Sequence, residues 1–185
     1  RNVILAGGGS FAYSRDTTGF IRCWGDNQFG QLGKGNLKQT YKVSDFSTKN
    51  QDIDLSLLKD VVTASDYSYL WLNDGRVFGV GNNSYLPLSL REGIYSTHKE
   101  TKLPVAPKAL VTGFGHVLML TENGQVYAWG RNSNYQVGNG KRKNVQEPYL
   151  LPLENIVQLA GGGKFSPEDS CTRGQIVTFL YRAFK

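Results

Sequence analysis

Short apolar runs that end at a glycine-containing dipeptide recur along the chain. The alternating runs 69–72 and 117–120 lead to the turn dipeptides Asp74-Gly75 and Asn123-Gly124, and an earlier turn dipeptide is Thr18-Gly19. Another short strand ending in glycine follows each dipeptide, at 20–25, 76–81 and 125–130. Asp-Gly and Asn-Gly are strong hairpin signals, because both central residues of a type I′ turn need positive φ. The pattern predicts repeated strand–turn–strand units.

These units belong to an internal repeat. Four segments align without gaps and begin at Val3, Val61, Ala109 and Val157. A strand–hairpin–strand unit of about 50 residues, with glycine and tryptophan at fixed places, is typical of a propeller blade. We therefore predict a mainly β fold with about three blades over residues 1–163, where a fourth blade begins, and a separate helical segment over residues 164–185.

The repeat also carries family-specific residues. The third copy has Gly113 and His116, then Thr-Glu-Asn-Gly-x-Val-Tyr-x-Trp-Gly-x-Asn over 121–132, and the first copy has Gly-Gln-Leu-Gly-x-Gly over 30–35. Residues 3–163 thereby resemble the regulator of chromosome condensation (RCC1-like) repeat family, whose members fold as seven-bladed β-propellers. The copies depart from this pattern at Ser10, Ser68 and Lys164, which stand in the place of His116, and at 85–88, where Tyr-Leu-Pro-Leu replaces the Gly-Gln-Leu-Gly turn.

Composition agrees with a turn-rich β protein. The 185 residues include 22 Gly, and Phe 9, Tyr 10 and Trp 3 give 22 aromatic residues. With 39% hydrophobic and 19% charged residues, the chain is neither a disordered tail nor a membrane-spanning protein. We interpret the repeat glycines as structural, and Trp24 and Trp129 as side chains that fill the space between blades.

Charge does not concentrate on one segment. The net charge of +6 is spread along the chain, and the one basic run is Lys141-Arg142-Lys143. This run is either a solvated loop or a phosphate or nucleic-acid contact, and nucleic acid is not predicted as a partner. The connections 36–59 and 85–108 are longer than the third blade needs, and such loops are where binding function tends to lie.

No motif indicates catalysis, a cofactor or a metal. The cysteines Cys23 and Cys171 are predicted to be buried and unpaired, and His98 and His116 lack partners at metal-ligand spacing. The triple-glycine runs 7–9 and 161–163 lack the Gly-Lys-Ser/Thr ending of a phosphate-binding loop. The acids Asp66, Asp74 and Glu122 show no pairing that suggests a catalytic cleft, and we predict that the chain is not an enzyme.

The last 21 residues depart from the repeat. Apolar residues at 176, 179, 180, 183 and 184 follow a helical period, and Thr172 with Gln175 forms a capping box. Residues 165–185 resemble the second half of a bacterial surface-layer homology motif, in which the Thr-Arg pair and the following acid or amide contact cell-wall polysaccharide. The resemblance implies a glycan contact at Thr172, Arg173 and Gln175. The capping box and a surface salt bridge of Arg173 would explain the same residues structurally.

We therefore predict a non-enzymatic binding module that presents loops on a propeller and is part of a larger bacterial surface or secreted protein. Its partner would be a protein or a cell-surface glycan. The alternative is a cytoplasmic or nuclear guanine-nucleotide exchange factor or chromatin-associated regulator, as in eukaryotic members of the resembled family, and a third possibility is a glycan-processing enzyme. Three blades do not close a ring, so we expect self-association or further blades. The first residues indicate a strand and lack the apolar core of a signal peptide, which suggests a fragment or processed product.

Overall fold

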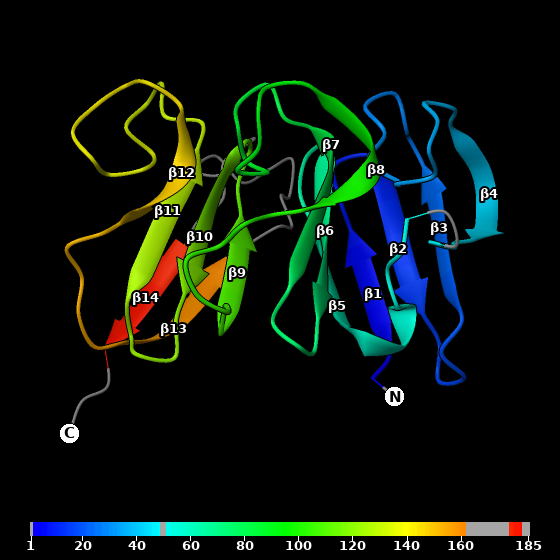
Figure 1. Cartoon of the computed structure of the whole chain (residues 1–185), viewed down its shortest axis with the longest axis horizontal. Coiled ribbons are helices and arrows are strands. Elements are labelled where there is room, and N and C mark those ends of the chain that lie inside the picture. The colour runs from blue at the N-terminus through cyan, green and yellow to red at the C-terminus, as the bar shows by residue number, and fades with distance from the viewer. Residues whose placement is uncertain (1, 49–50, 162–177, 183–185) are drawn as a thin grey trace, which may run out of the picture. The chain divides into compact units, whose positions relative to one another are not determined.

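The computed structural model describes residues 2–48, 51–161 and 178–182, and its regular secondary structure consists almost entirely of antiparallel strands (Figure 1). Three sheets have four strands each, in the orders β1-β2-β3-β4, β5-β6-β7-β8 and β12-β11-β10-β9, and a fourth pairs β13 with β14. The strands are β1 (Ile4–Gly7), β2 (Phe11–Arg15), β3 (Ile21–Gly25), β4 (Thr40–Asp45), β5 (Leu58–Thr63), β6 (Tyr67–Leu72), β7 (Val77–Asn82), β8 (Ile94–Glu100), β9 (Ala109–Thr112), β10 (His116–Leu120), β11 (Val126–Gly130), β12 (Val145–Leu150), β13 (Ile156–Gly161) and β14 (Thr178–Arg182).

These sheets confirm the predicted propeller blades. Each four-stranded sheet is an up-and-down meander of neighbouring strands, which is the plan of a propeller blade. The one helix in the described residues is a single 3₁₀ turn, η1 (Leu55–Leu57), capped by the side chain of Asp54. No helix in that part of the chain is long and apolar enough to cross a membrane.

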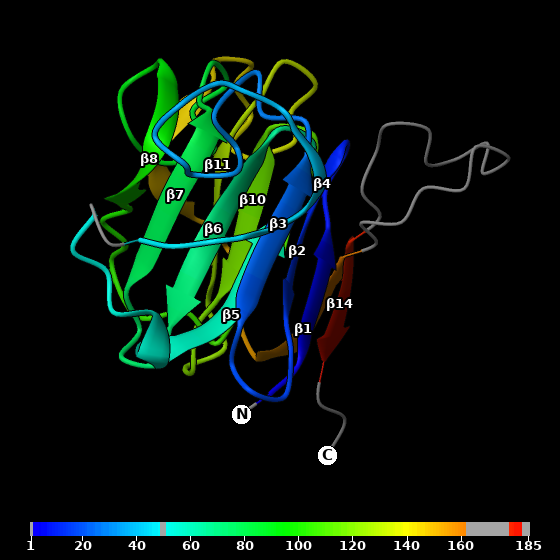
Figure 2. The same ribbon diagram turned by 90° about the vertical axis from the view of Figure 1, so that its right-hand side faces the viewer.

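The chain divides into two compact units. The first contains residues 1–84 and 92–102, and so holds the first two blades; the second contains residues 85–91 and 103–185. In the first unit the two blades pack face to face, and Figure 2 shows β1 to β4 together with β5 to β7. Their shared core contains Ile4, Phe11, Tyr13, Ile21, Cys23, Leu32, Phe46, Ile53, Leu58, Val61, Leu70, Leu72 and Phe78.

The glycines at 8 and 9 allow the inner strands of these two blades to approach. Gly9 donates its backbone N–H to the carbonyl oxygen of Ala64 at 3.0 Å, and a Cβ on Gly9 would lie 2.4 Å from the carbonyl oxygen of Ser65. Thr63 Oγ1 donates to the carbonyl oxygen of Gly7 at 2.8 Å. These glycines therefore let the backbones of two blades pack closely, in agreement with their structural interpretation.

The hairpins form where predicted but with a different turn. In the second blade Gly75 donates to the carbonyl oxygen of Leu72 at 3.0 Å, and in the third Gly124 donates to that of Thr121 at 3.1 Å. Only the glycine of each dipeptide has positive φ, which is 92° for Gly75 and 76° for Gly124. Asp74 and Asn123 do not have positive φ. A β-turn followed by one left-handed glycine replaces the expected type I′ turn.

The second unit has its own small core, made by Leu120, Val126, Ile156 and Leu159. Here the predicted helix after residue 172 is wrong over 178–182, where the structure has strand β14 paired antiparallel with β13. The segment Thr-Phe-Leu-Tyr-Arg is rich in β-formers, and pairing with β13 supplies the backbone hydrogen bonds that an edge strand lacks. The rest of the predicted helix lies outside the described residues.

Candidate protein-interaction surface

The predicted glycan-contact residues Thr172, Arg173 and Gln175 lie outside the described residues, and their role stays a prediction. The predictions for the cysteines and for metal ligands can be compared with the described residues. Cys23 is free and fully buried, as expected, and burial raises the pKa of its thiol to about 11. Cys171 lies outside the described residues. No group of three or more His, Cys, Asp or Glu in the described ranges could hold a metal ion.

Two of the three acids considered for catalysis, Asp66 and Asp74, have structural partners in their own blade. Asp74 forms an ion pair with Arg76 at 2.9 Å in the β6–β7 turn. Asp66 accepts a hydrogen bond from Asn82 Nδ2 at 2.9 Å and, through its backbone carbonyl, from the N–H of Asn82 at 3.0 Å. These contacts explain both carboxylates as parts of turns.

A buried asparagine holds the long loop that follows β11. Asn132 has no exposed surface, and its Nδ2 donates to the carbonyl oxygens of Lys141 and Lys143 at 2.7 and 3.0 Å. Its Oδ1 accepts the N–H of Val137 at 3.0 Å. Asn27 holds the equivalent loop of the first blade in the same way, whereas the fully buried asparagine of the second blade is Asn83.

The anchored loop presents an arginine against two aromatic rings. The guanidinium carbon of Arg131 lies 4.7 Å from the ring centre of Tyr85 and 5.4 Å from that of Phe114. The two rings are tilted with centres 6.5 Å apart. Gly115 allows this approach, because a Cβ there would lie 2.9 Å from Tyr85 Cδ2. Tyr85 and Phe114 remain 37% and 44% exposed, so the stack is open to a partner.

Ser133 joins this stack to a second arginine–aromatic pair. Arg131 Nε donates to Ser133 Oγ at 3.3 Å, and Arg142 Nε donates to the carbonyl oxygen of Ser133 at 3.0 Å. The guanidinium of Arg142 lies 5.2 Å from the ring centre of Tyr135, which is 54% exposed. We call the continuous group the aromatic–arginine surface, and it consists of Tyr85, Phe114, Arg131, Ser133, Tyr135 and Arg142.

The electrostatics of this surface are positive. The sequence from 127 to 146 contains Arg131, Lys141, Arg142 and Lys143 but no acidic residue. Among the described residues, the ion pairs involve Arg22 and Arg76 and leave Arg131 and Arg142 without a carboxylate. His116 adds no charge near neutral pH, because burial and then the positive charge of Arg131 lower its pKa. Exposed arginine and tyrosine are the residue types that dominate protein-binding energies.

Sequence reasoning found part of this surface. It singled out the basic run at 141–143 and the long connection that begins at 85, but it treated Tyr85 only as a departure from the repeat. Arg131 was missed because its partners Tyr85 and Phe114 are distant in sequence. An arginine directly after the Trp-Gly strand end, in a chain with aromatics before the preceding strand, is the signal that could have indicated it.

Comparison with known proteins identifies the repeat. Two profiles of the regulator of chromosome condensation (RCC1) repeat match residues 123–166 and 108–136. The chain is 30% identical over 155 residues to the secretion-regulating guanine nucleotide exchange factor of Bos taurus, covering 79% of this chain and 32% of that protein. It is 27% identical over 174 residues to the E3 ubiquitin-protein ligase HERC2 of Homo sapiens, covering 87% of this chain and 3% of that protein.

A solved structure shares the fold. Prp20p from Saccharomyces cerevisiae superposes with a TM-score of 0.76 at 16% identity, covering 98% of this chain and 44% of that chain. The chain thus spans about a third of the bovine exchange factor and under half of Prp20p. It contains an RCC1-like repeat segment, as the sequence motifs predicted.

Proposed function

We propose that this chain is the protein-binding part of an RCC1-like propeller, and that the aromatic–arginine surface binds an acidic patch on a partner protein. The observation that carries the proposal is Arg131, stacked between two half-exposed aromatic rings with no acidic neighbour in its loop. A stacked guanidinium keeps its hydrogen-bond donors in a fixed plane, which suits bidentate contact with a carboxylate.

The kind of partner follows from the relatives. Prp20p binds Gsp1p and histones, and the bovine relative is a guanine nucleotide exchange factor. These similarities favour the predicted alternative, a protein regulator of the exchange-factor type in the cytoplasm or nucleus, over a glycan-binding module of the bacterial surface. Exchange activity is the second candidate function, supported by the 30% identity to the bovine factor. Further blades would complete the ring that three blades leave open.

The binding test uses Gsp1p and core histones as probes for the chain. Arg131→Glu reverses the charge at the centre of the surface and is expected to weaken binding at least tenfold. Lys108→Glu makes the same charge change just before β9, whereas Gly113 follows the opposite end of that strand. The affinity of this control should stay within about twofold of the wild type. Equal loss in both variants, or no binding to either probe, contradicts the proposal.

Exchange activity has its own assay. The release of labelled GDP from Gsp1p and from a panel of small GTPases is measured with and without the chain. Faster release that is lost with Arg131→Glu and retained with Lys108→Glu supports exchange through this surface. Unchanged release from every GTPase contradicts the exchange function and leaves the binding measurement to decide the first proposal.

A further inference from the structure

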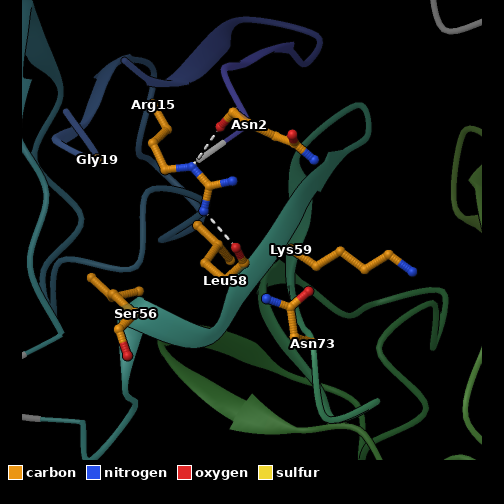
Figure 3. A pocket seen from close by; sticks show the side chains of 8 residues that line it. Asn2, Arg15, Gly19, Ser56, Leu58, Lys59 and Asn73 are labelled. Atoms are coloured by element: carbon orange, nitrogen blue, oxygen red, sulfur yellow. Dashed lines mark hydrogen bonds between the residues drawn. The ribbon is translucent and has the colours of Figure 1, made fainter. Parts of the chain in front are cut away.

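A polar pocket lies beside the hairpin turns of the first unit (Figure 3). Its volume is about 250 Å³. It lies between the end of β2 and the start of β5, and none of the described residues that line it carries a carboxylate. The lining residues are Asn2, Arg15, Gly19, Leu55, Ser56, Leu58, Lys59 and Asn73.

Arg15 is a buried cation with unused donors in this pocket. The residue is only 5% exposed, and its guanidinium is fixed by Nε donating to the carbonyl oxygen of Asn2 at 2.9 Å and Nη1 donating to that of Leu58 at 2.5 Å. These bonds use two of the five N–H donors of an arginine. Within the described residues Nη2 makes no hydrogen bond, and Figure 3 shows it directed into the space beside Asn2.

Among the residues whose structure is described, no carboxylate contacts the guanidinium of Arg15. In the described part of the chain Arg15 forms no ion pair. Asp60 is close enough to interact electrostatically, but its Oδ1 accepts the N–H of Val61 at 2.8 Å. Asp54 is engaged with the N–H of Ser56 at 2.9 Å. A buried arginine without a contacting anion carries a desolvation cost that a bound anion would offset.

The other polar groups of the pocket suit a single negative charge. Asn73 and Ser56 are exposed at the rim, and neither brings a formal charge. The side chain of Lys59 extends away from Arg15 (Figure 3), and its ammonium lies 4.1 Å from the ring centre of Trp71. One fixed guanidinium with adjacent free N–H groups matches the two oxygens of a carboxylate.

We propose that this pocket is a carboxylate-binding site that receives an aspartate or glutamate side chain of a partner protein. The partner as the source of the carboxylate rests on the proposed function, whereas the binding of a free carboxylate does not. The guanidinium of Arg15 binds the carboxylate through Nη2 and the free N–H of Nη1, and the amide of Asn73 supplies a neutral donor at the rim. The pocket is separate from the aromatic–arginine surface in sequence and in its lining residues.

The test is a titration of the isotopically labelled chain with acetate at constant ionic strength, with chloride as the balancing ion. The arginine Nε–H signal of Arg15 and the amide signals of Ser56 and Asn73 are expected to shift and saturate in the millimolar range. Asn73→Asp places a negative charge at the rim and should raise the apparent Kd for acetate at least fivefold. Asn123→Asp, the same change in the β10–β11 turn, should leave it within twofold.

Other variants and anions complete the test. Arg15→Lys keeps the charge but loses the planar fork, and we expect it to lose saturation while thermal unfolding shows that it is folded; if it does not fold, Asn73→Asp alone decides. Linear shifts without saturation, or equal affinities of Asn73→Asp and the wild type, overturn the proposal. Inorganic phosphate binding more than tenfold tighter than acetate also overturns it, because the site would then be a phosphate site.

Discussion

One side-chain oxygen of Gln51 contacts two nitrogen atoms of His98 in the first unit. Its Oε1 accepts the backbone N–H of His98 at 2.7 Å and lies 3.0 Å from Nδ1 of the same residue. His98 is buried, and its ring packs edge-on against Phe46 with centres 5.8 Å apart. Because Gln51 Oε1 can only accept, Nδ1 carries the proton. Nε2, which has no partner among the described residues, is then the bare nitrogen.

This arrangement predicts a loss of stability in mild acid. Burial lowers the pKa of His98 to about 3, from an ordinary value of 6.5. Above pH 6.5 the ring is neutral in both the folded and the unfolded chain, so its contribution is complete. Between pH 6.5 and 3 only the unfolded chain takes up the proton, and the free energy of unfolding falls by up to about 1.4 kcal/mol per pH unit.

Urea unfolding of the wild type and of His98→Gln from pH 7.5 to 5 measures this effect. The variant lacks the titrating ring, and its stability should vary less with pH than that of the wild type. His116, whose pKa is also lowered by burial, is present in both proteins and cancels in the difference. Parallel pH profiles for the two proteins would refute the role of His98.

A second prediction concerns the tryptophan of the third blade. Trp129 is fully buried, and its indole Nε1 donates to the carbonyl oxygen of Pro87 at 2.7 Å. Trp129→Phe removes this hydrogen bond and leaves a gap where the larger ring packed, and should lower the free energy of unfolding by about 2 kcal/mol.

Trp24 is the matched control, because it occupies the same repeat position in the first blade but is only half-buried. Trp24→Phe should cost under about 0.5 kcal/mol. Chemical denaturation of both variants measures the difference, and equal losses would show that burial at this position is not what stabilises the blade.

The loop anchor gives a third prediction. Asn132→Ala removes the hydrogen bonds to Lys141, Lys143 and Val137 and leaves the buried N–H of Val137 unpaired, which should cost about 3 kcal/mol. Asn134→Ala, an exposed asparagine in the same loop, should change stability by under about 0.5 kcal/mol. Amide hydrogen exchange should also show faster exchange across 133–143 in Asn132→Ala only; protection retained there would exclude the anchoring role.

Much of this fold could be predicted because the sequence signals for its hairpins and strand ends are local. Glycine at the hairpins and at the Trp-Gly strand ends marks a backbone geometry that few other residues adopt, so the blades could be located from sequence alone. The predicted helix over residues 178–182 failed because its apolar spacing fits both a helix and a strand. Pairing with β13 decides between them, and that partner is not visible in the local pattern.

The candidate sites depend on contacts that no local pattern contains. Arg131 meets Tyr85 across 46 positions (131 minus 85), and Arg15 donates to Leu58 across 43. In both cases the repeat positions could be predicted, but the partners Tyr85 and Leu58 come from the connections 85–108 and 36–59. Arg15 in particular fits the alternating burial pattern of strand β2. Only its burial beside an open pocket distinguishes it from other strand residues.

The fourth prediction tests the glycine that ends β11. Gly130 has a φ of +98°, and a Cβ there would lie 2.3 Å from the carbonyl oxygen of Gly115. Gly130→Ala therefore combines backbone strain with a clash against main chain that cannot rotate away, and should cost more than about 3 kcal/mol. Gly140 has a φ of +73° with nothing within 4 Å of its Cβ position, so Gly140→Ala carries only the conformational strain, about 1 kcal/mol. Thermal and urea unfolding of the two variants separates the two costs. A Gly130→Ala protein as stable as Gly140→Ala would mean that the close approach of β10 and β11 at Gly115 is not required by the blade.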